Sequence, residues 1–287
     1  MKLVTWNVQS ARTPAGTADW QQVLATLQRL PRFDILCLQE VSSGFAARDG
    51  SAGGDGFTQL AACLPGYRAA SALALDVAGA DGGRRRLGCM SFSRFPIVQV
   101  LRHSLPWPAD PAVPSMPRSV LELTLGTPRG LLRVLNAHLE YFSETQRLAQ
   151  VDGLRTLQQE ACAHAHAHAR TPRAGLDADG PFAAIPRAAD AVLLGDFNML
   201  PASPSRQRLL APFEDGTPAW RDAWQLARPE QAHAPTVGIR GTDPFTFDYA
   251  FVGAGLAPRV RAMHVGDAAG GSDHQPLLLE LDGVEPD

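Results

Sequence analysis

Polar side chains that could do chemistry stand at the ends of the apolar runs of this sequence. They are Asn7, Glu40, Asn136, His138, Asp196, Asn198, Asp248, Asp273 and His274. Carboxylates and amides outnumber imidazoles in this set, and ligands so rich in oxygen suit Mg²⁺ or Mn²⁺ better than Zn²⁺. The residue types therefore predict a hard divalent cation, a chemistry that points to phosphate.

The spacing of these residues supports a common location. Successive residues of a strand face opposite ways, so Asp196 and Asn198 share one side of their strand, as do Asn136 and His138. Ligand sites favour the edge where strand ends meet. Taken singly, however, each residue could equally be an ordinary turn former or a solvated strand end.

Short apolar runs must position these side chains. Most runs are 5 to 9 residues long and contain β-branched or aromatic residues, which predicts strands rather than helices. The predicted strands cover 2–8, 33–40, 87–93, 119–125, 131–139, 191–196, 247–252 and 275–281.

Helical periodicity predicts a helix over 17–30 behind Thr17 as N-cap, and a second helix from Ser143, which forms a capping box with Gln146. A weaker pattern predicts a helix over 203–210. A helical turn is expected around two tryptophans, Trp220 and Trp224.

The alternating stretch ACAHAHAHAR at 161–170 extends the helix that starts at Ser143. His164 and His168 are spaced to bind a metal together. Protonated histidines near a helix C-terminus also suit the helix dipole, and this second interpretation is favoured.

Four long loops separate the predicted elements, at 42–56, 76–86, 103–118 and 170–190. Long loops in a compact protein often carry function, and we expect the first three to select the substrate. Arg84 belongs to a run of three arginines in the second loop and is a candidate substrate contact, although such runs are more often solvated.

The chain has 287 residues, with 29 acidic and 26 basic side chains, and 45% of its residues are hydrophobic. These values exclude disorder of the whole chain and predict a single domain over 1–287. No apolar run approaches the ~20 residues of a membrane span. The four cysteines are too scattered for a disulfide scaffold or a zinc ribbon. We expect the mature protein to be this whole chain, a cytoplasmic monomer with no obligate protein partner.

Five motifs, T-W-N-V, L-Q-E-V, H-L, G-D-F-N and S-D-H-x-P, occur in this order between Trp6 and Pro276. With them the sequence resembles the endonuclease/exonuclease/phosphatase superfamily. This superfamily of metal-dependent phosphoesterases includes exonuclease III, pancreatic-type deoxyribonucleases, neutral sphingomyelinases and inositol polyphosphate 5-phosphatases. The resemblance implies a four-layer α/β/β/α sandwich, in which two mostly antiparallel sheets pack face to face with helices outside.

The resemblance also implies roles for acidic and amide residues. Glu40 matches the carboxylate that holds the metal, Asn7 supports metal or phosphate, and Asp273 matches a residue that can contact a second metal. Asp196 matches the base for the attacking water. Asn198 matches the amide that holds the phosphate.

Two histidines complete the implied site. His274 matches the histidine that faces the scissile phosphate, and Asp248 matches the carboxylate that orients it. His138 stands where deoxyribonucleases and sphingomyelinases have a histidine and where abasic-site endonucleases usually have a tyrosine, so abasic-site repair is disfavoured. Asn136, on the same strand side as His138, is a candidate substrate contact.

The predicted function is Mg²⁺-dependent or Mn²⁺-dependent hydrolysis of a phosphate ester, most simply a phosphodiester. The alternatives are a phosphomonoesterase, a sphingomyelinase-like lipid phosphodiesterase, or a catalytically silent binding module. Nucleic acid stays open as a substrate. Because Lys2 is the only lysine and the net charge is −3, we expect a small diester to be preferred to a long duplex.

Overall fold

The computed structural model describes residues 1–13, 16–46, 53–170, 180, 187–239, 243–267 and 270–283. Within these residues, twelve strands form two sheets of six. The first sheet has the order β11 (Val260–Val265), β12 (Leu277–Leu281), β1 (Lys2–Asn7), β2 (Ile35–Ser43), β4 (Arg84–Ser93) and β3 (Arg68–Ala78). The second has the order β5 (Ile97–Ser104), β6 (Ser119–Thr127), β7 (Gly130–His138), β8 (Ala191–Asp196), β10 (Asp248–Gly253) and β9 (Trp220–Asp222).

Each sheet is built around one parallel pair of strands. These pairs are β1 with β2 in the first sheet and β7 with β8 in the second. All the other neighbouring pairs in the two orders are antiparallel. The two sheets are therefore mixed, with antiparallel pairing in the majority.

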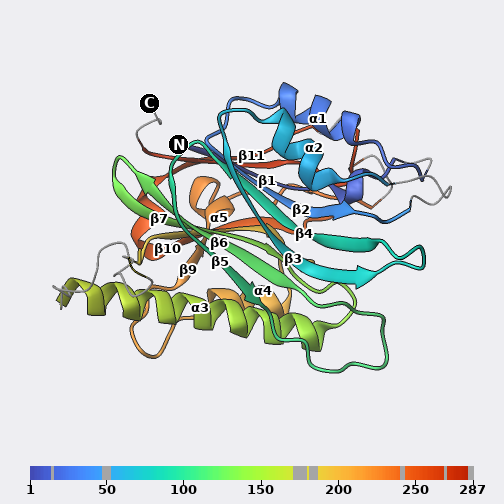
Figure 1. Cartoon of the computed structure of the whole chain (residues 1–287). Helices are drawn as coiled ribbons and strands as arrows, with labels where there is room; N and C mark the ends of the chain where they lie inside the picture. The colour runs from blue at the N-terminus through green and yellow to red at the C-terminus, as the bar shows by residue number, and fades with distance from the viewer. Residues whose placement is uncertain are drawn as a thin grey trace.

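Alternation of side chains along the strands separates three apolar clusters. On β1, for example, Leu3 packs between the two sheets while Val4 packs on the outer face, against the helices α1 (Trp20–Arg29) and α2 (Gly56–Cys63). The third cluster joins the outer face of the second sheet to α3 (Glu144–Arg170) and α4 (Pro204–Leu210). Figure 1 shows the resulting order of helices, sheet, sheet and helices, which is the predicted four-layer α/β/β/α sandwich.

Most of the predicted helices are present, with corrected boundaries. The first helix begins at Trp20 because Asp19, rather than Thr17, accepts the capping hydrogen bond, from the backbone N–H of Gln21. Ser143 caps α3 as predicted, but the side chain of Gln146 donates to loop 103–118 instead of completing the capping box.

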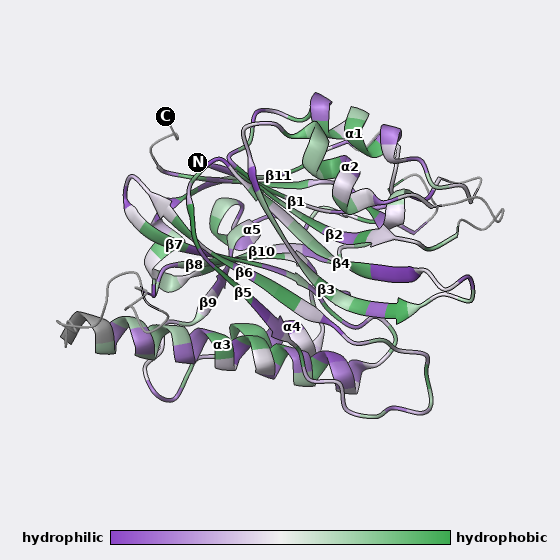
Figure 2. Ribbon diagram, viewed as in Figure 1, coloured by the Kyte–Doolittle hydropathy of each residue, from purple (hydrophilic) through white to green (hydrophobic). Residues whose placement is uncertain are grey.

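α3 extends through the histidine-containing stretch to Arg170, as the sequence predicted. Hydrophilic and hydrophobic residues alternate along this helix (Figure 2), because one of its faces packs on the second sheet. None of the helices in the described ranges has the length and apolar character needed to cross a bilayer.

Several elements were not predicted. They are α2 and the strands β3, β5, β9 and β11. Trp224 lies in the short helix α5 (Ala223–Ala227), as the predicted helical turn required, whereas Trp220 lies in β9. All four strands lie at sheet edges, where exposure on one side weakens the apolar signal.

Two of the predicted loops also need correction. Most of 76–86 is ordered as the ends of β3 and β4, which pair as a hairpin, so only its middle is a turn. Loop 170–190 lies largely outside the described residues. β5 extends to Ser104, so the loop predicted at 103–118 begins at 105 instead of 103.

The predicted site residues meet at one edge of the sandwich for a topological reason. β1, β2, β7 and β8 all end there, and each carries a polar side chain at or near its carboxyl end. β10 and β12 run antiparallel to their neighbours and therefore begin at the same edge. Strand ends from both sheets thus surround one opening.

Candidate active site

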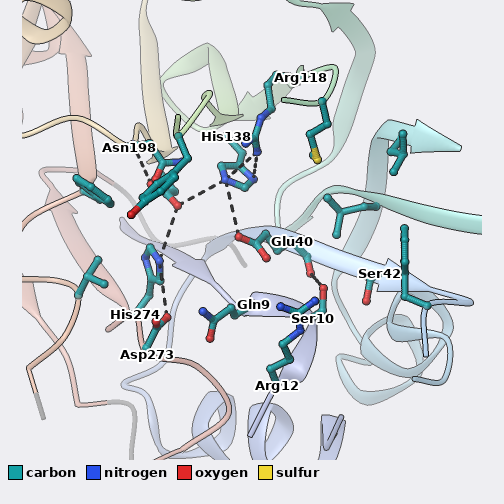
Figure 3. Close-up of a pocket in the computed structure, with 18 of the residues that line it drawn as sticks. Gln9, Ser10, Arg12, Glu40, Ser42, Arg118, His138, Asn198, Asp273 and His274 are labelled. Atoms are coloured by element: carbon teal, nitrogen blue, oxygen red, sulfur yellow. Dashed lines mark hydrogen bonds and ion pairs between the residues drawn. The ribbon is translucent and has the colours of Figure 1, made fainter. Parts of the chain in front are cut away.

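A cavity of about 550 Å³ opens at this edge. Its polar lining contains six of the residues that the sequence singled out: Glu40, His138, Asp196, Asn198, Asp273 and His274. In Figure 3, His138 and Asn198 approach the cavity from one side, and His274 and Asp273 approach it from another. Glu40 lies between His138 and Arg12 in this view. Asn7 and Asp248 lie buried directly behind these side chains.

Asn7 joins the two central carboxylates. Its amide nitrogen donates to Glu40 Oε1 at 3.0 Å and to Asp196 Oδ2 at 2.8 Å. The amide oxygen accepts from the backbone N–H of Gln9, 2.9 Å away. One fully buried amide therefore fixes the separation of two carboxylates from different sheets.

The backbone is strained where it delivers Glu40. The pairing of β2 with β4 shifts register between Leu38 and Val41, and Glu40 has φ 52°, in the left-handed region. A bulge of this kind turns one side chain out of the strand alternation. Non-glycine residues adopt such angles at a cost of about 1–3 kcal/mol, and they cluster at functional sites. The strain here aims Glu40 into the cavity.

Asp196 is held from its own strand end and from the loop that follows. Its Oδ1 accepts the backbone N–H of Asn198 at 3.0 Å, while Asn198 Nδ2 donates to the carbonyl of Leu139. Burial raises the pKa of Asp196 above its usual range, assisted by the charge of Asp248 and opposed by His274 and by the hydrogen bonds from Asn7 and Asn198. The cavity thus holds a carboxyl that binds a proton more readily than an exposed aspartate.

His274 and Asp248 form a buried pair. His274 Nδ1 lies 2.9 Å from Asp248 Oδ2, which also accepts the hydroxyl of Thr236 at 2.7 Å. Burial opposes the charge of His274, but Asp248 and Asp196 outweigh it and raise its pKa to about 10. His274 is therefore an imidazolium at neutral pH. Its Nε2 lies 3.8 Å from both Asp196 Oδ2 and Asp273 Oδ1.

His138, unlike His274, is held in its neutral form. Its Nε2 lies 3.6 Å from Asp196 Oδ2 and 3.9 Å from Glu40 Oε1. Burial lowers its pKa well below the usual value, and the positive charges of Arg118 and His274 lower it further. His138 is consequently neutral, so the two histidines of the cavity are not equivalent.

Arg118 is a cavity residue that the sequence reasoning missed. Its Nη1 donates to the His138 ring, 3.0 Å from Nε2, and its Nε donates to Glu140 Oε2 at 3.3 Å. Both Arg118 and Glu140 are buried. No motif marks Arg118 in the sequence, since it stands alone in a proline-containing loop directly before β6.

Two predicted substrate contacts lie away from the cavity lining. Asn136 Nδ2 donates to the carbonyls of Leu38 and Met90, and its Oδ1 accepts from Gln39. It is fully buried and ties the second sheet to the first. Arg84 is half exposed and pairs with Asp76 across the β3–β4 hairpin, 2.9 Å away.

One group of residues fits a hard divalent cation. Glu40, His138 and Asp196 each offer a ligand atom, and these atoms lie within 4.8 Å of one another. Two carboxylates and one imidazole suit Mg²⁺ or Mn²⁺. Asp196, Asp248 and His274 are equally close, but the hydrogen bond between Asp248 and His274 already occupies those groups.

Comparison with known proteins agrees with this geometry. No curated protein matches the sequence. The structure is similar to that of an endonuclease/exonuclease/phosphatase from Beutenbergia cavernae, with a TM-score of 0.66 and 22% identity over 100% of this chain and 72% of that one. It is also similar to a mannosyl-6-phosphatase of Bacteroides thetaiotaomicron, with a TM-score of 0.65 and 18% identity over 98% of this chain and 99% of that one. A third similar structure, truncated Caenorhabditis elegans TDP2, has a TM-score of 0.62 and 17% identity over 98% of this chain and 96% of that one.

These identities are low, so the solved structures show a shared fold. The sequence model of one family provides the more specific comparison, because it matches residues 4–274 and so spans every residue that lines the polar part of the cavity. The chain belongs to the endonuclease/exonuclease/phosphatase family.

Proposed function

We propose that this protein hydrolyses a phosphate ester, most simply a phosphodiester, with Mg²⁺ or Mn²⁺ as cofactor, and that residues 1–287 act as one catalytic domain. The observation that carries the proposal is the contrast within the cavity. Two carboxylates bridged by Asn7 face an imidazolium, His274, across a distance of 3.8 Å from Asp196. Because Asp196 and His274 lie side by side, a single phosphoryl group in the cavity in front of them would meet both an acceptor for protons and a cation.

Glu40 would hold the cation with Asn7 in support, and Asp273 would be available to a second one. Glu40, His138 and Asp196 are close enough to share the cation, and Asn7 fixes the separation of the two carboxylates. When bound, a divalent cation supplies positive charge to the phosphoryl oxygens.

The side chains of the chain itself have separate roles in this proposal. Asp196, with its raised pKa, would accept the proton of the attacking water. The imidazolium of His274 would stabilise charge on the phosphoryl oxygens, and Asp248 would keep it protonated and fix the orientation of its ring. Asn198 would hold the phosphate, and Arg118 would add a cation beside neutral His138.

A phosphomonoesterase is a second candidate. One protein of similar structure is described as a mannosyl-6-phosphatase, and its chain is covered almost completely. The polar groups around the cavity could bind the three non-bridging oxygens of a phosphomonoester as well as the two of a diester.

The test is a substrate panel with Mg²⁺, Mn²⁺ or chelator: plasmid DNA, single strands, RNA, bis-nitrophenyl phosphate, nitrophenyl phosphate and sphingomyelin. We expect hydrolysis that chelator abolishes and Mg²⁺ restores. Absence of hydrolysis with every substrate and both metals would refute the proposal and favour a silent binding module. A preference for nitrophenyl phosphate over its diester would identify the phosphomonoesterase.

Glu40→Gln is the sharpest variant for this panel. A neutral amide is a much poorer ligand for a hard dication than a carboxylate, so turnover should vanish while the melting temperature stays within a few degrees of the parent. Glu230→Gln is the matched control, because Glu230 is exposed and does not line the active-site cavity. Undiminished hydrolysis by Glu40→Gln at limiting Mg²⁺ would remove Glu40 from the site.

A further inference from the structure

Aromatic side chains form one wall of the active-site cavity. The wall consists of Tyr141, Phe142, Phe245 and Phe247, all of which line the cavity. Tyr141 contacts Phe142 edge to face with ring centroids 4.8 Å apart, and it contacts Phe247 at 6.0 Å. Phe247 in turn contacts Phe245 at 4.6 Å. The four rings are therefore continuous.

The wall lies directly beside the polar groups. The carbonyl of Phe247 accepts the backbone N–H of Phe197, which stands between Asp196 and Asn198. Phe245 pairs through its backbone with Val237, and Val237 bridges to His274. The rings and the polar residues therefore line neighbouring parts of the same cavity, where a group attached to a bound phosphoryl can contact the rings.

Two of the rings are unusually exposed for apolar side chains. Tyr141 is 50% exposed and Phe142 is 56% exposed. Backbone hydrogen bonds hold both residues: the N–H of Phe142 donates to Glu140 in a partly buried bond, and Arg147 donates to the carbonyl of Tyr141. Exposed apolar groups that gather at a cavity mark an interaction site. Their fixed backbone makes this site preorganised.

Glu140 connects this wall to the phosphate side of the cavity. One carboxylate oxygen accepts from Phe142 and the other from Arg118. The same buried side chain therefore positions Phe142 and Arg118, the arginine that lies against His138.

The charges that line the cavity suit one phosphoryl group. In the described part of the lining, Arg12 and Arg118 are the two permanent cations, against three carboxylates on Glu40, Asp196 and Asp273. Apart from the aromatic wall, the lining includes the apolar side chains of Leu75, Leu87 and Met116 and the uncharged polar side chains of Gln9, Ser10 and Ser42. In the described lining, uncharged side chains rather than further cations therefore surround the charged centre.

We propose that the substrate carries a single phosphoryl group esterified to an aromatic alcohol, and that its ring stacks on the exposed face of Phe142, which sets it edge-on to the perpendicular ring of Tyr141. This inference rests on the proposed function and narrows its substrate class. Aromatic side chains attract a flat ring through its π-face. An aliphatic group of equal size makes hydrophobic contact but cannot stack.

The test compares two ligands of equal size, one with an aromatic ring and the other with a saturated ring. Benzylphosphonate and cyclohexylmethylphosphonate have the same number of heavy atoms, and their carbon–phosphorus bonds resist hydrolysis. Calorimetric titration in Mg²⁺ should show benzylphosphonate binding about tenfold more tightly, as expected for one stacked ring. Hydrolysis of bis-nitrophenyl phosphate is measured on the same samples.

A pair of matched variants locates the effect. Phe142→Leu keeps an apolar side chain but removes the ring, and the affinity ratio should fall towards one. Trp107→Leu is the control, because Trp107 is also 50% exposed but does not line the cavity. The ratio should be unchanged in that variant, and melting temperatures confirm that both are folded.

Equal affinity of the parent for the two phosphonates would overturn the inference, and so would a ratio that survives Phe142→Leu. If neither phosphonate binds while bis-nitrophenyl phosphate is hydrolysed, the ring subsite is wrong and the proposed function stands. If benzylphosphonate binds preferentially but no phosphate ester is hydrolysed, the ring subsite is supported and the proposed function fails.

Discussion

Replacing Asp248 with asparagine removes one negative charge beside His274 and leaves the shape of the side chain unchanged. Asp248 Oδ2 lies 2.9 Å from His274 Nδ1 and is also held by Thr236. With charge centres about 4 Å apart and an effective dielectric constant of about 20, the two unit charges attract by about 4 kcal/mol. That energy corresponds to about three pKa units.

The pKa of His274 is about 10 in the parent. It should fall to about 7 in Asp248→Asn, because burial then opposes the imidazolium with only Asp196 and Asp273 to support it. A raised histidine pKa keeps the cation present until the pH rises through that value. The parent therefore retains the cation through neutral pH, whereas the variant loses it as the pH rises through about 7.

Two measurements check this result. An NMR titration of the His274 imidazole in chelator reports its pKa in each protein. The pH dependence of kcat with Mg²⁺ should show the variant close to the parent near about pH 6 and about tenfold lower near about pH 8, in proportion to the protonated fraction.

His274→Ala supplies the limiting case. It should reduce kcat by at least ~10², with a smaller effect on KM, and Asp248→Asn should cost less at every pH. Because Asp248 acts through His274, the double variant should be no worse than His274→Ala. Identical titration of His274 in parent and Asp248→Asn, or effects that multiply in the double variant, would refute the pair.

Two further predictions concern the scaffold. A Cβ added at Gly195 would lie 1.9 Å from the carbonyl oxygen of Ala137, so Gly195→Ala should push β8 away from β7. Denaturant titrations should then show a loss of about 1–3 kcal/mol in the free energy of unfolding, and kinetics should show reduced turnover. Gly126→Ala is the control, because its Cβ would meet its nearest atom at 3.6 Å, and it should change neither stability nor turnover. Burial opposes the charge of Glu122, but His103 and Arg133 lower its pKa to about 2. Its contribution to stability is thus present above about pH 4.5 and lost as the pH falls through about 2, so Glu122→Gln should cost roughly 3 kcal/mol at neutral pH, and a cost that does not shrink towards acid pH would contradict this sign.

The central strands could be predicted from the sequence because they are buried on both faces. β1, β8 and β12, for example, are short and mostly apolar, and such runs are more typical of strands than of helices at this length. The edge strand β3 is rich in alanine and half exposed, so its local pattern is weak. Its pairing with β4 determines its conformation, and that pairing is a tertiary contact.

The limits of spacing arguments are clearest at Asn136. It shares a strand side with His138, as the alternation of β7 requires, yet it is two residues deeper and hydrogen bonds between the sheets. Strand alternation predicts which face of the sheet a side chain points to, but it does not predict how far the side chain lies from the cavity. For the same reason, the sequence could not show that Arg118, from a loop without a motif, reaches His138.

By itself, the sequence determined the family, the layered fold and the identity of six polar residues that line the cavity, because strand periodicity and five ordered motifs are local properties of the chain. It left open which histidine carries the charge, since both have the same intrinsic pKa. Only the tertiary structure decided this. Folding places His274 against Asp248 and His138 against Arg118, so that neighbouring charges raise the pKa of one imidazole and lower that of the other.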